Sequence, residues 1–297
     1  MPAKNVSRYI AEAVEPLTNE SNILWELIVV DDHSDDSTFD LLVNMSRNDK
    51  RIKAFRNPGK GKVQALNFGY QQSIGEIIKC IDSDDVLLPD FFKFGESLRK
   101  YRAHCHDFIL VDEALKYLGP YYINPAFLKL DYQLVLSQLI SLPRCTWSFH
   151  REVAQRIFPM PDELPFEDVW FSLVIKREVT EIKYIREKLY LYRQHDGQTF
   201  GGILNYQKEK IQFRARRMLM LIKVLKKNQA LLGYDTPDVF DYSVEYNSLM
   251  AESVSVRNII FSELKVIHKA KLILICFFPA VASLVTRLKW RIDRLKR

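Results

Sequence analysis

The sequence is poor in cysteine. Its 297 residues include four cysteines, Cys80, Cys105, Cys145 and Cys276, and no two of them are close together in the chain. A disulfide-rich scaffold needs a denser set, and a structural zinc site needs ligands in closely spaced pairs. The cysteines therefore exclude both classes and indicate a protein of a reducing compartment.

Long hydrophobic runs are also missing. Lys4, Arg8 and Glu12 interrupt the first residues, so we expect no secretory signal there. An uncharged apolar stretch near the C-terminus, Leu272–Val285, would form a helix about 21 Å long, which is short of the ~30 Å hydrocarbon core of a membrane. Because Pro279 interrupts it and basic residues flank it, we expect it to lie in the membrane interface. A helical hairpin packed on the protein is the alternative.

Positive charge is not spread evenly along the chain. The sequence has 43 Lys and Arg against 37 Asp and Glu, which gives a formal net charge of +6. Residues 1–201 hold 25 basic and 29 acidic side chains, whereas residues 202–230 hold eight and one, and residues 262–297 hold nine and two. This distribution excludes a polyanion-binding core, so no nucleic-acid partner is expected. The basic stretch 262–297 is expected to bind an anionic membrane surface.

Short apolar runs alternate with amphipathic segments over the first 111 residues. The apolar runs predict strands, and apolar residues spaced three or four apart predict helices. We expect strands at Leu24–Val30, Arg51–Arg56, Glu76–Ile81 and Asp107–Val111, and helices from about Ser37, at Val63–Ser73 and at Pro89–Lys100. The alternation predicts an α/β fold with a mostly parallel sheet flanked by helices. No strand is expected before the first helix, so the first strand of such a sheet is missing.

The residues Asp82-Ser83-Asp84-Asp85 directly follow the predicted strand Glu76–Ile81. Parallel sheets bind ligands at the carboxyl ends of their strands, so this is the position of a binding site. Crowded carboxylates repel one another, and a divalent cation relieves that repulsion. Their oxygen atoms suit Mg²⁺ or Mn²⁺ bound to a diphosphate. The alternative is that Asp84 or Asp85 caps the helix that follows.

A second acidic group follows the other apolar strand. Asp31 and Asp32 stand at its end, where a carboxylate can bind a nucleobase or a ribose. The loop after the next strand contains Lys60 and Lys62, which either lie near a diphosphate or are two solvated lysines on a turn. This loop lacks the spacing of a P-loop, which disfavours a nucleoside triphosphatase.

Two further groups carry candidate residues. Glu167 and Asp168 head an apolar-periodic segment, where they either favour a helix N-terminus by charge or supply a general base for a substrate hydroxyl. His195 follows a predicted strand and is either a metal ligand or a surface histidine. His104 and His106 lack the second ligand pair of a zinc site and are expected on a surface turn.

Taken together, these segments resemble the family 2 glycosyltransferases, a group of inverting sugar transferases with an A-type nucleotide-sugar-binding fold. The resemblance runs in order through residues 2–200. The matching segments are Pro2-Ala3-Lys4-Asn5 with Tyr9-Ile10, LIVVDDHSDDST, NPGKGKVQALNFGYQQSIGEIIKCIDSDDVLLPD, FEDVWFSL and LYRQHDGQT. Family members usually begin with an apolar strand that leads into a turn with an aromatic residue; here that strand is absent and Lys4 replaces the aromatic residue.

The resemblance implies metal-dependent transfer of a sugar from a nucleoside diphosphate to an acceptor hydroxyl, with inversion at the anomeric carbon. It implies that Asp32 binds the nucleobase, that Asp82 approaches the ribose and that Asp168 deprotonates the acceptor. The implied ligands of Mg²⁺ or Mn²⁺ are Asp84, Asp85 and His195. The remaining residues expected to bind the nucleotide sugar are Pro2, Ala3, Lys60 and Ser83.

We expect three regions in the chain. Residues 1–111 form the nucleotide-sugar-binding half and residues 112–201 the acceptor-binding half of one catalytic domain, and residues 202–297 form a basic, helical, membrane-associating region. The resemblance implies a bacterial protein that acts on a glycan or lipid-linked acceptor in cell-surface polysaccharide synthesis, in the cytoplasm at the inner face of the membrane. Two alternatives stay open: a haloacid-dehalogenase-like phosphotransferase, and a non-catalytic nucleotide-sugar-binding protein.

Overall fold

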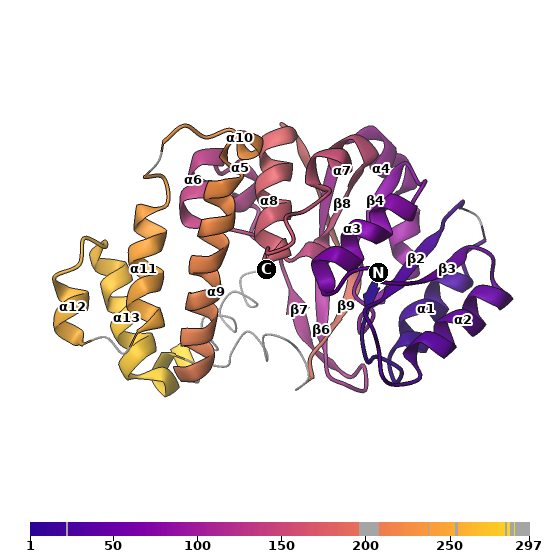
Figure 1. Cartoon of the computed structure of the whole chain (residues 1–297), viewed down its shortest axis with the longest axis horizontal. Coiled ribbons are helices and arrows are strands. Elements are labelled where there is room, and N and C mark those ends of the chain that lie inside the picture. Colours follow the sequence, from indigo (N-terminus) through magenta and orange to yellow (C-terminus); the bar gives the residue numbers. More distant parts are fainter. Residues whose placement is uncertain are drawn as a thin grey trace. The chain divides into compact units, whose positions relative to one another are not determined.

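The computed structural model describes residues 1–21, 23–195, 208–236, 238–252, 255–282, 284, 285 and 288 (Figure 1). Tertiary contacts divide the chain into two units. The first unit comprises Met1–Tyr132 and Ile140–Arg193, and the second comprises Gln133–Leu139 and Gln194–Arg297. Strands and helices alternate in the first unit, which confirms the predicted α/β class.

A three-stranded parallel sheet forms the N-terminal part of the first unit. Its strands are β1 (Pro2–Ala3), β2 (Leu27–Asp31) and β3 (Ile52–Arg56), in that order. The connecting helices are α1 (Ile10–Thr18) and α2 (Thr38–Asn48), and α3 (Lys62–Gln72) follows β3. The expectation that no strand precedes the first helix is wrong. Two residues pair with the end of β2, and such a short strand leaves no apolar run in the sequence by which to detect it.

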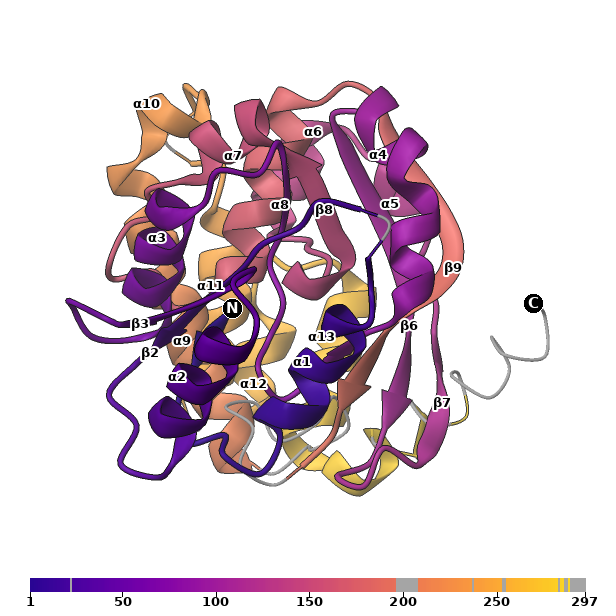
Figure 2. The ribbon, with the colours of Figure 1, turned by 90° about the vertical axis from the view of Figure 1, so that its right-hand side faces the viewer.

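The second sheet of this unit is mixed. Its strands are β4 (Ile77–Lys79), β5 (Val86–Leu87), β6 (Ala103–Val111), β7 (Tyr117–Tyr121), β8 (Trp147–His150) and β9 (Ile182–Arg193), in the order β4-β8-β6-β9-β5 with β7 on β6 (Figure 2). Only β6 and β9 pair in parallel among its described strands. The predicted parallel pairing is therefore limited to this pair and the first sheet, and the other described pairs of the second sheet are antiparallel.

Strand β6 carries two histidines that the sequence placed on a surface turn. That prediction is wrong, since His104 and His106 are both fully buried in the sheet. His104 Nε2 lies 2.7 Å from the Ser97 carbonyl oxygen, and His106 Nε2 lies 2.6 Å from Lys79 Nζ. Burial lowers the pKa of His104 to about 4, so its ring is neutral at pH 7 and compatible with the core.

Helices and short 3₁₀ turns complete the first unit. They are η1 (Pro89–Phe94), α4 (Gly95–Lys100), α5 (Ala126–Lys129), η2 (Arg144–Thr146), α7 (Arg151–Ile157) and α8 (Glu167–Glu178). Helix α8 is buried on all sides from Val169 to Ile175, as expected of a helix in the protein interior. The indole of Trp170 donates to the Ile157 carbonyl oxygen at 2.9 Å. This packing fixes the first turn of α8, where Asp168 lies.

The second unit is helical. Its elements are most of α6 (Tyr132–Gln138), then α9 (Lys208–Lys227), α10 (Gln229–Leu232), α11 (Asp241–Ala251), α12 (Val256–Ile260) and α13 (Val266–Phe277). Helix α9 corresponds to the predicted basic helix, whose residues 203–207 lie outside the described part of the chain. In the described residues no helix combines the length and the apolar character needed to cross a membrane.

Candidate active site

The acidic turn Asp82–Asp85 lies between β4 and β5, at the carboxyl end of β4. Asp82 Oδ1 accepts a hydrogen bond from Arg144 Nη2 and lies 2.9 Å from Lys62 Nζ. The Asp82 amide donates to the Tyr190 hydroxyl oxygen at 3.0 Å. Burial alone would raise the pKa of Asp82, but the charges of Arg144 and Lys62 outweigh it and hold that pKa well below the usual range. Asp82 is therefore a permanent anion with two cationic partners.

Arg193, the last residue of β9, fixes the other half of the acidic turn. Its amide donates to Asp85 Oδ1 at 2.7 Å, and its Nε donates to the Asp84 carbonyl oxygen at 2.7 Å. The Arg193 side chain is buried and also pairs with Glu12 of α1 at 2.6 Å. Burial, together with the charges of Asp84 and Asp82, raises the pKa of Asp85 well above its usual range.

Asp32 directly follows β2 and is buried. Its Oδ1 accepts hydrogen bonds from Asn57 Nδ2 at 2.7 Å and from the Gly61 amide at 2.8 Å. Its own amide donates to the Ala3 carbonyl oxygen of β1 at 2.7 Å, and Lys4 Nζ lies 3.8 Å from its Oδ2. Gly61 has a φ of 94°, a left-handed conformation that favours glycine and that presents its amide to Asp32.

Asp168 occupies the first turn of α8. Its Oδ1 accepts a hydrogen bond from the Arg144 amide at 2.7 Å. Burial and the neighbouring Glu167 raise its pKa to about 6, although Arg144 and Lys62 partly oppose this shift. A carboxylate whose pKa lies near the working pH can take up a proton and release it again, which is the requirement for a general base.

These contacts link the predicted site residues into one chain of interactions. Gly61 and Lys62 are adjacent in the chain. The Gly61 amide contacts Asp32, and the Lys62 side chain contacts Asp82. Arg144 then contacts Asp82 through its side chain and Asp168 through its amide. The structure therefore brings together three carboxylates that are far apart in the sequence. They come from the end of β2, the end of β4 and the head of α8.

The carboxylates of Asp84 and Asp85 fit a divalent cation in chemistry and in charge. In the described residues no group of three or more His, Cys, Asp or Glu side chains is arranged as a metal site. Mg²⁺ is nevertheless commonly held by only one or two carboxylates together with substrate phosphates and water. The Arg193 amide donates to one oxygen of Asp85, and burial, followed by the charges of Asp84 and Asp82, raises the pKa of Asp85. Asp84 and Asp85 therefore suit a divalent cation that is bound at the same time by the phosphates of a substrate.

Other predicted residues lie in different surroundings. Pro2 is in β1, Ser83 is buried in the acidic turn, and the Lys60 side chain is exposed while its amide donates to Gln64 Oε1 at 2.7 Å. His195 lies two residues after the end of β9 and belongs to the second unit. The assignment of nucleotide or metal binding to these residues stays a prediction.

Sequence reasoning missed Arg144, which is 3% exposed. It is part of the segment Ser141-Leu142-Pro143-Arg144, which shows no periodicity and no motif. Its Nη1 is buried and has no hydrogen-bond partner among the described residues. The only available signal is an arginine within an apolar stretch, and that signal does not identify a partner.

The model of the glycosyl transferase family 2 matches residues 1–158, and the chain belongs to this family. Its membership argues against the phosphotransferase alternative. Among curated relatives, the teichuronic acid biosynthesis glycosyltransferase TuaG of Bacillus subtilis is 33% identical over 85 residues, which are 28% of this chain and 34% of TuaG. The chain spans between 15% and 58% of the length of the first curated relatives that it matches.

Two solved structures share the fold over nearly the whole chain. TarS residues 1–349 of S. aureus, in complex with UDP-GlcNAc, superposes with a TM-score of 0.56 at 16% identity and covers 98% of this chain and 90% of that one. The mannosyltransferase PcManGT of Pyrobaculum calidifontis, in complex with GDP-Man and Mn²⁺, has a TM-score of 0.54 at 15% identity. The superposition covers 98% of this chain and 79% of PcManGT. These similarities confirm the predicted A-type glycosyltransferase fold.

Proposed function

We propose that the protein transfers a sugar from a nucleoside-diphosphate sugar to an acceptor hydroxyl, with inversion at the anomeric carbon. The observation that carries this proposal is the chain of contacts that begins at Asp32, passes through Gly61 and the adjacent Lys62 to Asp82, and ends through Arg144 at Asp168. A site of this kind offers anchoring groups for a donor and a separate proton acceptor for the attacking hydroxyl. TarS and PcManGT, which share the fold, were solved with nucleotide sugars, and this supports the donor class.

Asp32 and Asp82 are the proposed donor-binding carboxylates. Asp32 is held by Asn57 and Gly61 in a fixed orientation, so that it can accept hydrogen bonds from a nucleobase without rearrangement. Asp82 is ionised and can accept a hydrogen bond from a ribose hydroxyl. Pro2, Ala3, Lys60 and Ser83 are proposed to line the same subsite, within a donor-binding half formed by residues 1–111.

Asp168 is the proposed general base. It removes the proton from the acceptor hydroxyl as that oxygen forms its bond to the anomeric carbon and the bond to the diphosphate oxygen breaks. The nucleoside diphosphate leaves with the electron pair of the broken bond. In-line attack requires the base and the leaving group on opposite sides of the sugar, so the acceptor enters from the side of Asp168, within residues 112–201.

Asp84 and Asp85 would hold a Mg²⁺ or Mn²⁺ ion, with His195 as a further candidate ligand. When bound, such an ion offsets the negative charge that develops on the leaving diphosphate. The cation in PcManGT supports this assignment. Arg193 keeps the two carboxylates in place through its contacts to Asp85 and to the Asp84 backbone.

A panel of nucleotide sugars with and without Mn²⁺ tests the proposed function. Thermal shift reports binding, and release of nucleoside diphosphate reports transfer or hydrolysis. We expect one nucleotide class to raise the melting temperature in the presence of Mn²⁺ and its sugar conjugate to release diphosphate. Stabilisation by a nucleotide that does not depend on Mn²⁺, without release of diphosphate, would identify the non-catalytic alternative, and the absence of any stabilisation would contradict the proposal.

We also propose that the second unit associates with an anionic membrane surface, as in cell-surface polysaccharide synthesis at the inner face of the membrane. Side chains of α13 and the segment before it are apolar and exposed: Phe261 is 78%, Val266 82% and Ile267 72% exposed. Lys265 and Lys271 are exposed beside them. Apolar groups and basic groups on one short region are the composition of an interfacial anchor. The teichuronic acid biosynthesis named for TuaG supports a role in polysaccharide synthesis.

Co-sedimentation with vesicles tests the membrane association. The double variant Lys265→Gln/Lys271→Gln should bind anionic vesicles about 30-fold more weakly than the parent chain, since each basic residue near such a surface contributes about 1 kcal/mol. The matched control is Lys116→Gln/Lys129→Gln, which removes the same charge from exposed positions of the first unit. Equal loss in both variants, or no binding by the parent chain, would contradict the proposal.

A further inference from the structure

A short segment, residues 142–146, is attached to the helix that carries the proposed base. The Leu142 amide donates to Ser172 Oγ at 3.0 Å. The Arg144 amide donates to Asp168 Oδ1 at 2.7 Å. Both acceptors belong to α8, and because they are four residues apart they lie on the same face of that helix. Two backbone amides of segment 142–146 therefore hold the first half of α8.

The same segment is attached to β4 and to the acidic turn that follows it. Arg144 Nη2 donates to Asp82 Oδ1 in the acidic turn. Lys79 is the last residue of β4, and its Nζ donates to the Cys145 carbonyl oxygen. Segment 142–146 thus connects the donor-binding carboxylate with the base, and it does so through contacts on both sides.

Internal hydrogen bonds make segment 142–146 stiff. The Thr146 hydroxyl and the Thr146 amide both donate to the Pro143 carbonyl oxygen, at 2.7 Å and 3.0 Å. Pro143 also has a fixed φ angle because of its ring. A displacement at one attachment is therefore transmitted to the other attachments instead of being absorbed within the segment.

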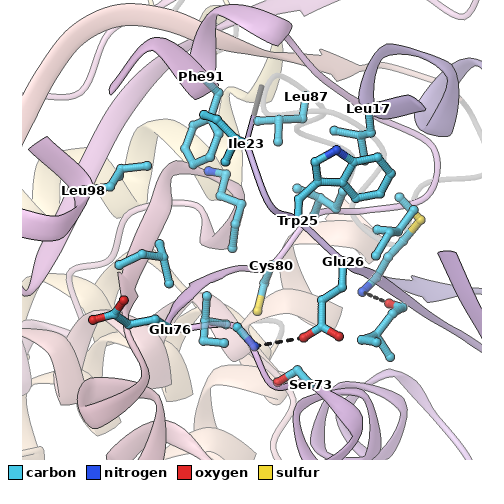
Figure 3. Close-up of a pocket in the computed structure, with 18 of the residues that line it drawn as sticks. Leu17, Ile23, Trp25, Glu26, Ser73, Glu76, Cys80, Leu87, Phe91 and Leu98 are labelled. Atoms are coloured by element: carbon cyan, nitrogen blue, oxygen red, sulfur yellow. Dashed lines mark hydrogen bonds between the residues drawn. The ribbon is translucent and has the colours of Figure 1, made fainter. Parts of the chain in front are cut away.

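Lys79 anchors the segment on the side of β4. It lines a cavity of roughly 930 Å³ together with apolar side chains, among them Phe91, whose ring centroid lies 5.4 Å from Lys79 Nζ (Figure 3). In such surroundings an ammonium requires acceptors for its three N–H groups. Besides the Cys145 carbonyl oxygen, Nζ contacts the Trp147 carbonyl oxygen at 3.3 Å and His106 Nε2 at 2.6 Å.

His106 is arranged to accept a hydrogen bond from Lys79. Its Nδ1 lies 2.7 Å from the Asp107 carbonyl oxygen, which can only accept, so Nδ1 carries the proton and Nε2 is the acceptor. Burial and the charge of Lys79 hold the pKa of His106 well below its usual range, and the ring is neutral. Burial lowers the pKa of Lys79 to about 7, and only its protonated form donates to all three acceptors at once.

We propose that segment 142–146 sets the position of the base relative to the donor-binding carboxylate, with Lys79 and Arg144 as positioning residues. This proposal rests on the proposed function. In-line attack requires the acceptor oxygen, the anomeric carbon and the leaving oxygen to be aligned, and a misplacement of ~1 Å can cost about 100-fold in rate. Among the described contacts Lys79 touches neither Asp82 nor Asp168, so it acts on them through the segment.

The burial of Arg144 argues for more than a structural role. Its side chain is buried, and its Nη1 has no partner among the described residues. Apolar residues often replace a buried ion pair without loss of stability, so holding two elements together does not require an arginine. Its charge, together with that of Lys62, lowers the pKa of Asp168, whereas burial and Glu167 raise it. The other titratable groups described near Asp168 stay uncharged near neutral pH because burial raises their pKa: Tyr121, Cys145 and Tyr192.

Steady-state kinetics of the full chain tests the two attachments that lie outside the reacting groups. Lys79→Met removes the anchor on β4, and Ser172→Ala removes the attachment to α8. Each should lower kcat at least about tenfold and leave the donor KM within about threefold, because the donor-binding carboxylate stays in place. The matched control is Lys176→Met in α8, which also loses a bond to a backbone carbonyl, that of Leu128 at 3.0 Å, and a nearby ring, that of Phe127. It should keep its kcat.

Two substitutions of Arg144 separate its charge from its hydrogen bonds. Arg144→Lys keeps the charge, so the acidic limb of the pH–rate profile should move by no more than a few tenths of a pH unit. Arg144→Gln removes a cation that favours ionised Asp168, so this limb should move to higher pH by about one unit or more. Carbon-13 NMR of the Asp168 carboxyl group should show the same shift. A role in folding alone would lower the melting temperature of both variants and move the limb in neither.

Amide hydrogen exchange at Leu142 and Arg144 reports on the segment itself and should become at least about tenfold faster in Lys79→Met. Faster exchange with an unchanged kcat, or an equal loss of kcat in Lys176→Met, would overturn the proposal. If Lys79→Met does not fold, Ser172→Ala and the two Arg144 variants decide. A parent chain that transfers no sugar would show that the proposed function is wrong, and the positioning role with it. An active parent chain with equally active variants would show that only the positioning role is wrong.

Discussion

The acidic turn at the end of β4 and the acidic head of α8 both contact Arg144, yet their key carboxylates differ in electrostatic state. Asp82 of the turn is paired with the side chains of Arg144 and Lys62, and its pKa is held below the usual range. Asp168 of α8 accepts a hydrogen bond from the backbone amide of Arg144 and not from its side chain among the described contacts, and its pKa rises to about 6. Burial acts on both groups, so the placement of positive charge makes one an anchor and the other a proton acceptor.

The largest expected effect is on transfer in the variant Asp168→Asn. An amide cannot accept the proton of the acceptor, so the transfer rate should fall by about 10²–10⁴-fold while nucleotide binding is retained. The measurement is product formation together with nucleotide affinity. The neighbouring variant Glu167→Gln serves as the control and should keep its rate within a few-fold. Transfer by Asp168→Asn at the parental rate would show that Asp168 is not the base.

The second prediction concerns stability and the variant Asp82→Asn. It leaves the buried Arg144 without its carboxylate, which should lower the free energy of unfolding at pH 7.5 by about 3 kcal/mol and the melting temperature by about 6–12 °C. Because the pKa of Asp82 is depressed in the folded state, this contribution is present above the unfolded pKa of about 4 and is lost as the pH falls below it.

Asp168→Asn should behave in the opposite way in the same denaturation experiment. The raised pKa of Asp168 means that its ionisation costs folding free energy, a cost that develops as the pH rises from about 4 to about 6. The asparagine variant lacks this cost and should be at least as stable as the parent chain at pH 7.5. Equal destabilisation by both substitutions would remove the distinction between the two carboxylates.

The third prediction separates Asp84 from the rest of the acidic turn. The variant Asp84→Asn should lose the Mn²⁺-dependent part of nucleotide binding, an expected weakening of at least about tenfold, because an amide is a poorer ligand for a hard cation. The measurement is nucleotide affinity with Mn²⁺ and with a chelator. Asp90→Asn removes an exposed acid a few residues away and should leave the Mn²⁺ dependence intact.

The smallest expected effect is on the pH profile. Asp168 must be deprotonated to act as a base, so the rate should fall about tenfold per pH unit below pH 6. The negative charge of Glu167 raises the pKa of Asp168, so the variant Glu167→Gln should move the acidic limb of the pH–rate profile, where the rate falls, to lower pH. An unchanged limb in Glu167→Gln, or a limb that moves to higher pH, would contradict the origin assigned to the shift.

The sequence was sufficient to locate most elements of the first unit. Apolar runs predicted β2, β3 and the carboxyl-terminal part of β6, and the carboxylates after β2 and β4 stand where the runs end. The sequence failed where an element lacks a periodic signal of its own. The strand β1 has only two residues. His104 and His106 are polar but neutral in the core, so their burial follows from their contacts and not from their residue type.

The local order of residues determined which carboxylates stand at strand ends, because a buried apolar run must stop where charged side chains begin. Only the tertiary structure decided what each carboxylate does. Arg144 is 62 residues from Asp82 and 24 residues from Asp168, and it contacts both. Electrostatic effects depend on distance and on solvent exposure, which sequence spacing does not fix.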